Sequence, residues 1–128
     1  MNKAKVPYII ENVEGAPLLE HMTIQLCGSM FDLKVRRHRL FELGFMNGVL
    51  KEYRKNPLSC NHKKQGKPIG VYGSMGDTVK GTCKKTGKVV YGGSTAKTLE
   101  EAQEAMGINW LQWRDLTQAV PPKYTEYL

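Results

Sequence analysis

The sequence predicts a mixed α/β fold in a single domain, or α+β when the chain is considered alone. Short runs of β-branched residues mark strands in the N-terminal third, and helix-capping patterns mark helices in the C-terminal third. Glycines and lysines dominate the middle. A chain of 128 residues is long enough to bury one modest core.

Three strands are expected in the N-terminal third: residues 6–10 (VPYII), residues 23–26, and residues 39–43 with charged side chains on one side. The first strand runs directly into Glu11, although buried strands usually end in neutral or turn-forming residues. In an open α/β sheet, ligands bind at the carboxyl ends of the strands, so Glu11 is a candidate site residue. A solvated loop acid is an equally good interpretation of Glu11 taken alone.

The net charge of +7 is concentrated in the middle of the chain. Residues 34–88 hold fourteen Lys or Arg against three acids, a net charge of +11, whereas each flanking region has a net charge of −2. Such a basic segment attracts polyanions, nucleic acid above all. A solvated lysine-rich loop is the simpler alternative. Within this segment, residues 70–77 and 88–94 are expected to form short β-segments separated by a turn.

The first C-terminal helix is expected over residues 98–107, where the sequence has a capping box. Thr98 can accept a hydrogen bond from an amide of the first turn, and Glu101 can return the bond. Gly107 suits the left-handed position just past the helix end.

A second helix is expected to start near Asn109, with Trp110 and Trp113 as core anchors at helical spacing. Pro121 or Pro122 can open a third short helix, because the missing amide hydrogen costs nothing at the first helical position.

The segment VRRHRLFE at 35–42 carries a second candidate site. In an extended segment, alternation places Arg37 and Arg39 on one side and Arg36 and His38 on the other. Two guanidinium groups on one face suit a phosphate or a carbonyl-rich base edge. An exposed basic strand edge that discourages aggregation is the alternative.

The three cysteines, Cys27, Cys60 and Cys83, do not form an even framework and suit a reducing compartment. No stretch approaches the ~20 apolar residues of a membrane span, and the first residues do not resemble a secretory signal. We therefore expect a cytoplasmic protein with no membrane partner.

From the sequence we expect no metal site in this protein. Cys60, His62 and Cys83 provide three candidate zinc ligands, whereas zinc prefers four. His21 and His38 are possible fourth ligands, but no feature of the spacing recommends either.

Together these segments resemble the C-terminal half of cytosine-5 DNA methyltransferases, especially the compact enzymes of bacteriophages. Residues 11–13 (ENV) are similar to the family's Glu-Asn-Val motif, and residues 35–41 (VRRHRLF) to its Gln-x-Arg-x-Arg motif. Residues 116–122 (LTQAVPP) are similar to the closing Gly-Asn-Ala-Val-Pro-Pro motif. The similar segments cover more than half of the chain in the family's order.

The resemblance implies a role for each matched residue. Glu11 would hold and protonate the ring nitrogen of a flipped cytosine, which requires a carboxyl group in a dry pocket. Arg37 would contact the cytosine carbonyl, and Arg39 would support the pocket. The segment 118–120 would contact S-adenosylmethionine when a partner half is present; its residues are Gln118, Ala119 and Val120.

The resemblance also implies a division of the chain. Residues 1–43 would be the C-terminal strands of a Rossmann-like catalytic sheet, residues 44–97 a basic DNA-recognition region, and residues 98–128 helices that pack back on the sheet. Double-stranded DNA is the expected partner. The expected DNA-binding residues are Arg36, His38, Lys51, Arg54, Lys55, Lys63, Lys64, Lys67, Lys80, Lys84 and Lys85.

Two parts of the family's active site are missing from this sequence. No cysteine follows a proline, so the Pro-Cys nucleophile is absent, and there is no Phe-x-Gly-x-Gly cofactor loop. Val35 and Gln118 also replace a Gln and an Asn of the family motifs. We therefore expect a C-terminal fragment or subunit that is inactive without a complementing N-terminal half. The alternative is a stand-alone, catalytically dead nucleic-acid-binding module, or an inhibitor of a host nucleic-acid-handling protein.

Overall fold

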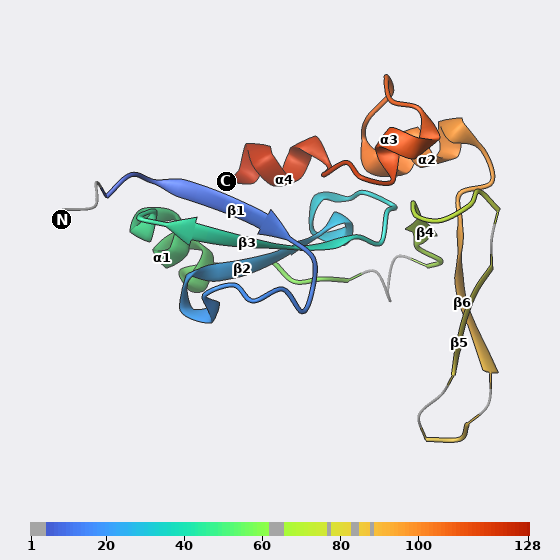
Figure 1. Ribbon diagram of the computed structural model, residues 1–128, viewed down its shortest axis with the longest axis horizontal. Coiled ribbons are helices and arrows are strands. Elements are labelled where there is room, and N and C mark those ends of the chain that lie inside the picture. The colour runs from blue at the N-terminus through green and yellow to red at the C-terminus, as the bar shows by residue number, and fades with distance from the viewer. Residues whose placement is uncertain (1–4, 62–65, 77, 83–84, 88) are drawn as a thin grey trace.

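The computed structural model describes residues 5–61, 66–76, 78–82, 85–87 and 89–128 (Figure 1). These residues form two small sheets and four α-helices, with two single-turn 3-10 helices, η1 and η2, on either side of β2. The elements are β1 (Tyr8–Asn12), η1 (Glu20–Met22), β2 (Thr23–Cys27), η2 (Gly28–Phe31), β3 (His38–Gly44), α1 (Asn47–Lys55), β4 (Ile69–Gly70), β5 (Thr78–Thr82), β6 (Val89–Thr95), α2 (Leu99–Met106), α3 (Trp113–Leu116) and α4 (Pro122–Tyr127).

The first sheet has the strand order β1-β3-β2, and both pairs are antiparallel. The three predicted strands are thus present, each shifted or extended by one or two residues at its ends. The chain is a small α+β fold, which confirms the fold class expected for the chain alone. Parallel pairing in the described residues is limited to β4 with β6 and a single bridge between Val35 and Ile69.

One face of this sheet forms the core. Phe41 and Leu43 of β3 and Ile24 and Leu26 of β2 lie on this face and are almost completely buried. Tyr124 of α4 packs edge-on against Phe41, with ring centroids 6.3 Å apart. The C-terminal helix therefore covers the sheet that the N-terminal third builds.

The opposite face of the sheet carries a buried carboxylate, Glu42. Its side chain accepts hydrogen bonds from the hydroxyl of Tyr8 (2.8 Å) and from the amide of Leu19 (2.7 Å). These bonds, the Leu19 amide first, hold the pKa of Glu42 below its ordinary value. Gly44 leaves room for the Tyr8 ring beside it, because a Cβ at that position would lie 2.0 Å from the ring.

Helix α1 was not predicted; it lies in the segment 44–97, which was expected to be a basic DNA-recognition region. Val49, Leu50 and Tyr53 share one helical face, and Leu50 joins the buried core. Arg54 and Lys55 in the last turn complement the negative end of the helix dipole. The first part of the expected recognition region therefore packs on the sheet.

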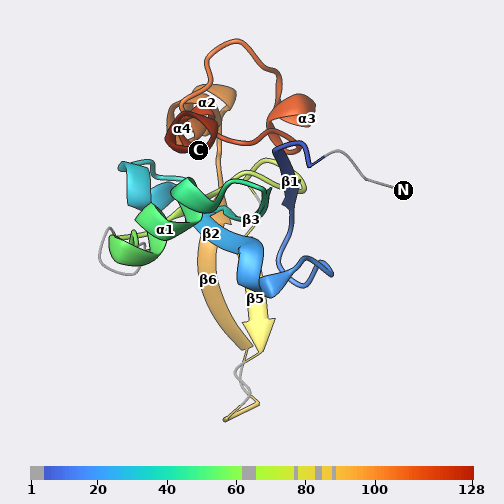
Figure 2. The ribbon, with the colours of Figure 1, turned by 90° about the vertical axis from the view of Figure 1, so that its left-hand side faces the viewer.

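The second sheet has the strand order β4-β6-β5. The backbone of residues 34–36 joins it to the first sheet, because the Ile69 amide donates to the Lys34 carbonyl and the Arg36 amide to the Ile69 carbonyl. The hairpin of β5 and β6 extends away from the molecule, opposite to the side where α2, α3 and α4 gather (Figures 1 and 2). The strand expected at 88–94 is confirmed as β6, at 89–95. The strand expected at 70–77 is wrong, because residues 72–76 form bends and turns between β4 and β5.

The caps of α2 confirm the predicted helix. The Glu101 amide donates to the Thr98 hydroxyl (3.2 Å), and Gly107 has a left-handed φ of 69°. The Glu101 carboxylate accepts from the Lys97 amide, one residue before the expected partner.

The second predicted helix is shorter than expected, since α3 starts at Trp113. Trp110 precedes it and is 67% exposed, so its assignment as a core anchor is wrong. Trp113 is half-buried and donates its indole N–H to the Gly73 carbonyl. The third helix starts at Pro122, as predicted. No described helix combines the length and apolar character that a membrane span requires.

The bonds of Glu42 predict how stability depends on pH. Its folded-state pKa is depressed, so its contribution is complete above the unfolded value of about 4.3 and is lost as pH falls through the folded-state pKa. Between neutral pH and about pH 3, urea unfolding should show a smaller loss of free energy for Glu42→Gln than for the wild type. Glu126→Gln, which removes an exposed carboxylate, should follow the wild type. An unchanged acid profile for Glu42→Gln would contradict this prediction.

Candidate nucleic-acid interface

A cleft of about 550 Å³ opens where β1 ends and β3 begins. Its size is within the range of small-molecule and nucleotide sites. Four of its eight lining residues are Arg or His, and one is acidic. The lining consists of Val13, Glu14, Arg36, Arg37, His38, Arg39, Tyr72 and Thr117. The basic motif predicted from the sequence therefore lines one cleft, together with Glu14 and Tyr72, which the sequence did not single out.

The carboxylate of Glu11 is held by Arg39. The two lie on neighbouring antiparallel strands, where Glu11 is opposite Phe41 and Arg39 is two residues away on the same face. The Arg39 Nε lies 2.7 Å from Glu11 Oε1. Their side chains are 18% and 36% exposed, respectively, so the pair is partly desolvated on the Arg39 side and open on the Glu11 side. The structure thus brings together two of the three predicted catalytic residues.

Arg37 lies in the interior with only 6% of its surface exposed. Its guanidinium donates to the carbonyls of Ala119 (2.7 Å) and Thr117 (3.1 and 3.2 Å) and, by a short contact, to that of Val71. Burial, with a smaller contribution from the charge of Arg39, lowers the pKa of Arg37 to about 10. The carbonyl acceptors compensate this desolvation.

The contacts of Arg37 differ from the role that the resemblance implied, which was a contact with the cytosine carbonyl. Arg37 borders the cleft, but its guanidinium donates to backbone carbonyls of the protein itself. The predicted alternation is visible before β3, where the exposed Lys34 and Arg36 alternate with the buried Val35 and Arg37. Alternation predicts which residues share a face but not which face is covered by segments distant in the sequence.

The third polar feature of the cleft is a bond between His38 and Glu14. His38 Nδ1 lies 3.0 Å from Glu14 Oε1, and the Gln25 amide donates to the same carboxylate oxygen at 2.7 Å. His38 is thus engaged within the protein, whereas its neighbour Arg36 presents its side chain to solvent. Of these two expected DNA-binding residues, Arg36 is the better placed for a phosphate.

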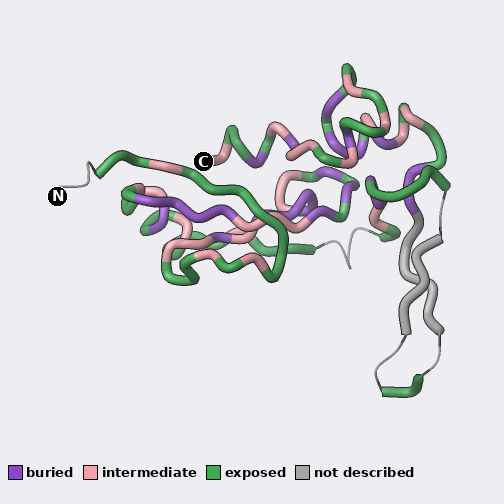
Figure 3. Tube along the Cα trace, in the orientation of Figure 1, coloured by how far each residue is buried: buried purple, intermediate pink, exposed green. Residues whose placement is uncertain are grey.

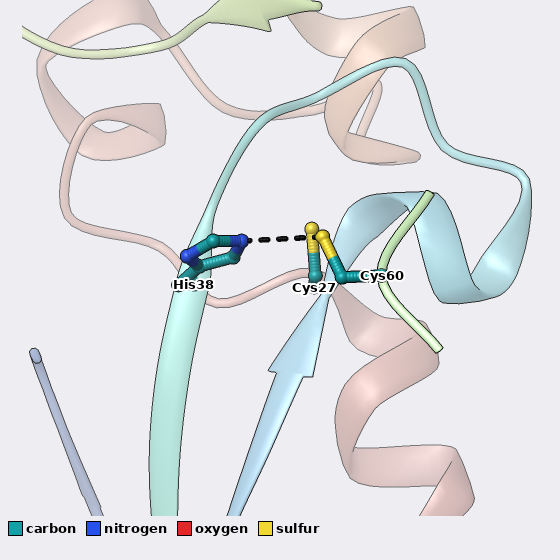
Figure 4. A group of neighbouring side chains, drawn as sticks. All are labelled: Cys27, His38 and Cys60. Carbon is teal, nitrogen blue, oxygen red and sulfur yellow. Dashed lines mark hydrogen bonds between the residues drawn. The ribbon is translucent and has the colours of Figure 1, made fainter. Parts of the chain in front are cut away.

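Behind His38 lie two cysteines (Figure 4). Cys27 ends β2 and is completely buried, while Cys60 is exposed in the loop after α1. The two sulfurs and a ring nitrogen of His38 all lie within 4.8 Å of one another, and all three side chains point to one spot. Burial, as the largest effect, raises the pKa of the Cys27 thiol. Two of the three candidate zinc ligands that the sequence offered, His62 and Cys83, lie outside the described residues.

The segment expected to contact a cofactor lies beside Arg37. The Ala119 carbonyl accepts from the guanidinium of Arg37, and Ala119 and Val120 are half-buried. Gln118 is exposed. Ala119 therefore has a structural role in this chain as an acceptor for Arg37.

Most of the remaining candidate DNA-binding residues that the structure describes are exposed. The exposed ones are Lys51, Arg54, Lys55, Lys67 and Lys85. Of these, Arg54 donates to the His21 carbonyl, which ties it to η1. Lys80 lies in β5, on the projecting hairpin, and Lys63, Lys64 and Lys84 lie outside the described residues. The candidate DNA-binding residues that the structure describes thus lie at the cleft, on α1, and in or next to the second sheet.

Comparisons with protein-family models, curated proteins and solved structures found no match to this chain.

The environment of Arg37 predicts that alanine lowers the free energy of unfolding much more at Arg37 than at the adjacent Arg36. Arg37→Ala leaves three carbonyls without their charged donor, so the free energy of unfolding should fall by about 3–5 kcal/mol. Arg36→Ala removes an exposed side chain and should change it by less than about 0.5 kcal/mol. Urea unfolding of both variants checks this, and equal stabilities would show that the buried guanidinium does not hold the fold together.

Proposed function

We propose that this chain is the base-holding, DNA-binding part of a cytosine-5 DNA methyltransferase that works with a complementing half. The single observation that carries the proposal is the Glu11–Arg39 ion pair beside a basic cleft. The pair joins two of the three motifs in which the sequence resembles that family, and these two motifs are separated by more than twenty residues of chain.

The chemistry of the pair suits the Watson–Crick edge of cytosine. A protonated Glu11 carboxyl can donate to the ring nitrogen N3 and accept from the exocyclic amino group. Arg39 is always charged and can donate to the neighbouring carbonyl oxygen. Since Arg37 is engaged by backbone carbonyls, we assign the cytosine carbonyl to Arg39 and a positioning role to Arg37. This assignment exchanges the roles that the resemblance implied.

The exposure of β1 supports a complementing half. One edge of β1 pairs with β3, and no described residue pairs with the other edge. Ile9 and Ile10 point to opposite faces of the strand and are 46% and 44% exposed, and Val6 and Val13 are exposed as well. The tube in Figure 3 marks almost the whole strand as exposed. A partner sheet that covered this strand would also exclude water from Glu11.

The complementing half would supply the Pro-Cys nucleophile and most of the S-adenosylmethionine site. Covalent activation of the cytosine ring needs that nucleophile. The isolated chain is therefore proposed to bind DNA and hold a flipped base without methylating it.

DNA affinity should be governed by phosphate contacts from residues 34–88. If about five Lys or Arg side chains engage phosphates, log K should fall with log salt at a slope of roughly −4 to −5. Fluorescence anisotropy with a labelled duplex over a series of salt concentrations measures this slope. Arg36→Ala should reduce its magnitude by about one. A salt-independent affinity, or no binding at low salt, would remove nucleic acid as the partner.

Glu11 should decide which flipped base is held. A duplex with a bulged cytosine should bind more tightly than one with a bulged thymine by about 1–3 kcal/mol, because thymine offers a donor at N3. Glu11→Ala should remove this preference, whereas Glu11→Gln should retain much of it, because an amide can still donate and accept. Competition binding with the two duplexes measures the effect.

The control for Glu11→Ala is Glu20→Ala, which removes the same charge from an exposed position in η1. With a methyltransferase N-terminal half that carries the Pro-Cys motif and the cofactor loop, Glu11→Gln should lower the methylation rate about 10²–10⁴-fold. A binding module with no catalytic partner predicts equal affinity for both bulges. Methylation by the isolated chain would refute the proposed division of the active site.

A further inference from the structure

Cys27 and Cys60 lie behind the cleft, and the proposed function assigns no role to either thiol. Cys27 and His38 are directly opposite each other in the β2–β3 ladder, at its end. Cys60 reaches them from the loop after α1, more than twenty residues further along the chain. Three elements thus deliver two thiols and an imidazole to one spot (Figure 4). We propose that Cys27, His38 and Cys60 bind a zinc ion that fastens the loop after α1 to the end of the sheet.

The spacing of the three donor atoms fits a tetrahedral ion. With Zn–S near ~2.3 Å and Zn–N near ~2.0 Å, neighbouring ligand atoms of a tetrahedral site lie ~3.4–3.8 Å apart. His38 Nε2 lies 3.4 Å from Cys60 Sγ, and all three donor atoms lie within 4.8 Å of one another. Zinc is the metal that this soft sulfur and nitrogen set favours.

The histidine already has the support that a metal ligand needs. Its Nε2 faces the sulfurs, while Nδ1 lies 3.0 Å from the Glu14 carboxylate. A carboxylate on the distal nitrogen fixes the ring and raises its basicity, as in carboxylate–histidine–zinc arrangements. Glu14 therefore acts as a positioning residue for His38 in this proposal.

Ser29 gives the cysteines matching support. It is buried, and its hydroxyl lies 3.3 Å from Cys27 Sγ and 3.5 Å from Cys60 Sγ. The same hydroxyl accepts a hydrogen bond from the Asn61 amide at 3.0 Å. The loop that carries Cys60 is thus held next to Cys27 by contacts that do not require the metal.

The charges balance at this position. Two thiolates neutralise a divalent cation, so the loaded site adds no net charge beside the arginines of the cleft. Binding of the ion would release the protons of the two thiols. Cys60 is exposed, which leaves the fourth coordination position open to water or to a further ligand.

The proposal does not rest on the methyltransferase assignment and is tested without DNA. The full chain is purified under reducing conditions without chelator, and its zinc content is measured by elemental analysis. We expect one zinc per chain, an increase of the melting temperature with added zinc, and a fall after chelation. Cobalt in place of zinc should give the intense visible absorption and the sulfur-to-metal charge-transfer bands of a tetrahedral thiolate site.

The variants are chosen so that a folding defect is not mistaken for loss of metal. Cys60→Ser alters an exposed side chain and should abolish stoichiometric zinc and the cobalt spectrum while the zinc-free chain stays folded. His38→Gln should do the same, with His21→Gln, an exposed histidine of η1, as its matched control. Glu14→Gln should weaken zinc affinity about 10- to 100-fold without abolishing it.

Three results would overturn the proposal. They are a chain without zinc that also fails to bind cobalt, zinc retained at full stoichiometry in Cys60→Ser, and equal loss of zinc in His38→Gln and His21→Gln. The first would identify the cluster as reduced thiols beside a histidine, and the other two would move the metal elsewhere in the chain.

Discussion

The buried guanidinium of Arg37 is the interaction on which the arrangement of this protein depends. It joins Val71, which follows β4, to Thr117 and Ala119, which follow α3, and all three acceptors are backbone carbonyls. Carbonyls buried without donors are costly, so the chain around them has few other stable arrangements. The backbone carbonyl of Arg37 also accepts the hydroxyl of Tyr124 at 2.6 Å, and burial raises the pKa of that tyrosine, which keeps it a donor. The guanidinium and the backbone carbonyl of Arg37 thus both hold the C-terminal third of the chain against the sheet.

This constraint also builds the site. Because Arg37 is fixed inward just before β3 begins, alternation places Arg39 on the same side and leaves Arg36 outside. Arg39 then meets Glu11 on the neighbouring strand, while His38 turns to the opposite face, toward Glu14 and the cysteines. A single extended segment therefore supplies the structural cation, the partner of the carboxylate, the exposed cation and the imidazole. Mutations in this segment need a stability measurement beside any functional one.

Features that depend on neighbouring residues could be predicted from the sequence. The three strands of the first sheet follow from β-branched runs, and the caps of α2 follow from Thr98 and Gly107, because these patterns act over a few residues. Helix α1 escaped prediction because its apolar face is only three residues wide and lies in a lysine-rich segment. Trp110 was misplaced because helical spacing predicts a face only where a helix forms.

The candidate site likewise has features that the sequence predicts and features that only the fold reveals. The membership of Glu11 and Arg39 could be predicted from motifs, but their contact requires the antiparallel pairing of β1 with β3. The Cys27–His38–Cys60 cluster has no sequence signature, because its spacing is set by a strand ladder and a loop after α1. Only the fold shows that Cys27 and Cys60 lie close together. The burial of Arg37 likewise depends on carbonyls some thirty-four and eighty residues away along the chain.

Strand β1, which carries Glu11, is anchored near both ends by side-chain contacts, whereas the side chains between these contacts are exposed. Tyr8 at its start is anchored by Glu42, and Glu11 near its end by Arg39, so its register does not need a second neighbour. Ile9 and Ile10 nevertheless stay exposed on opposite faces. In a strand with one face on the core and one face in solvent, the hydrophobic effect favours apolar residues on the buried face and polar residues on the exposed face. Apolar residues on both faces are typical of a strand covered on both sides, as in the interior of a larger sheet. The contacts at both ends of the strand hold the carboxylate in position without a further strand, so that association with the proposed complementing half would only have to exclude water.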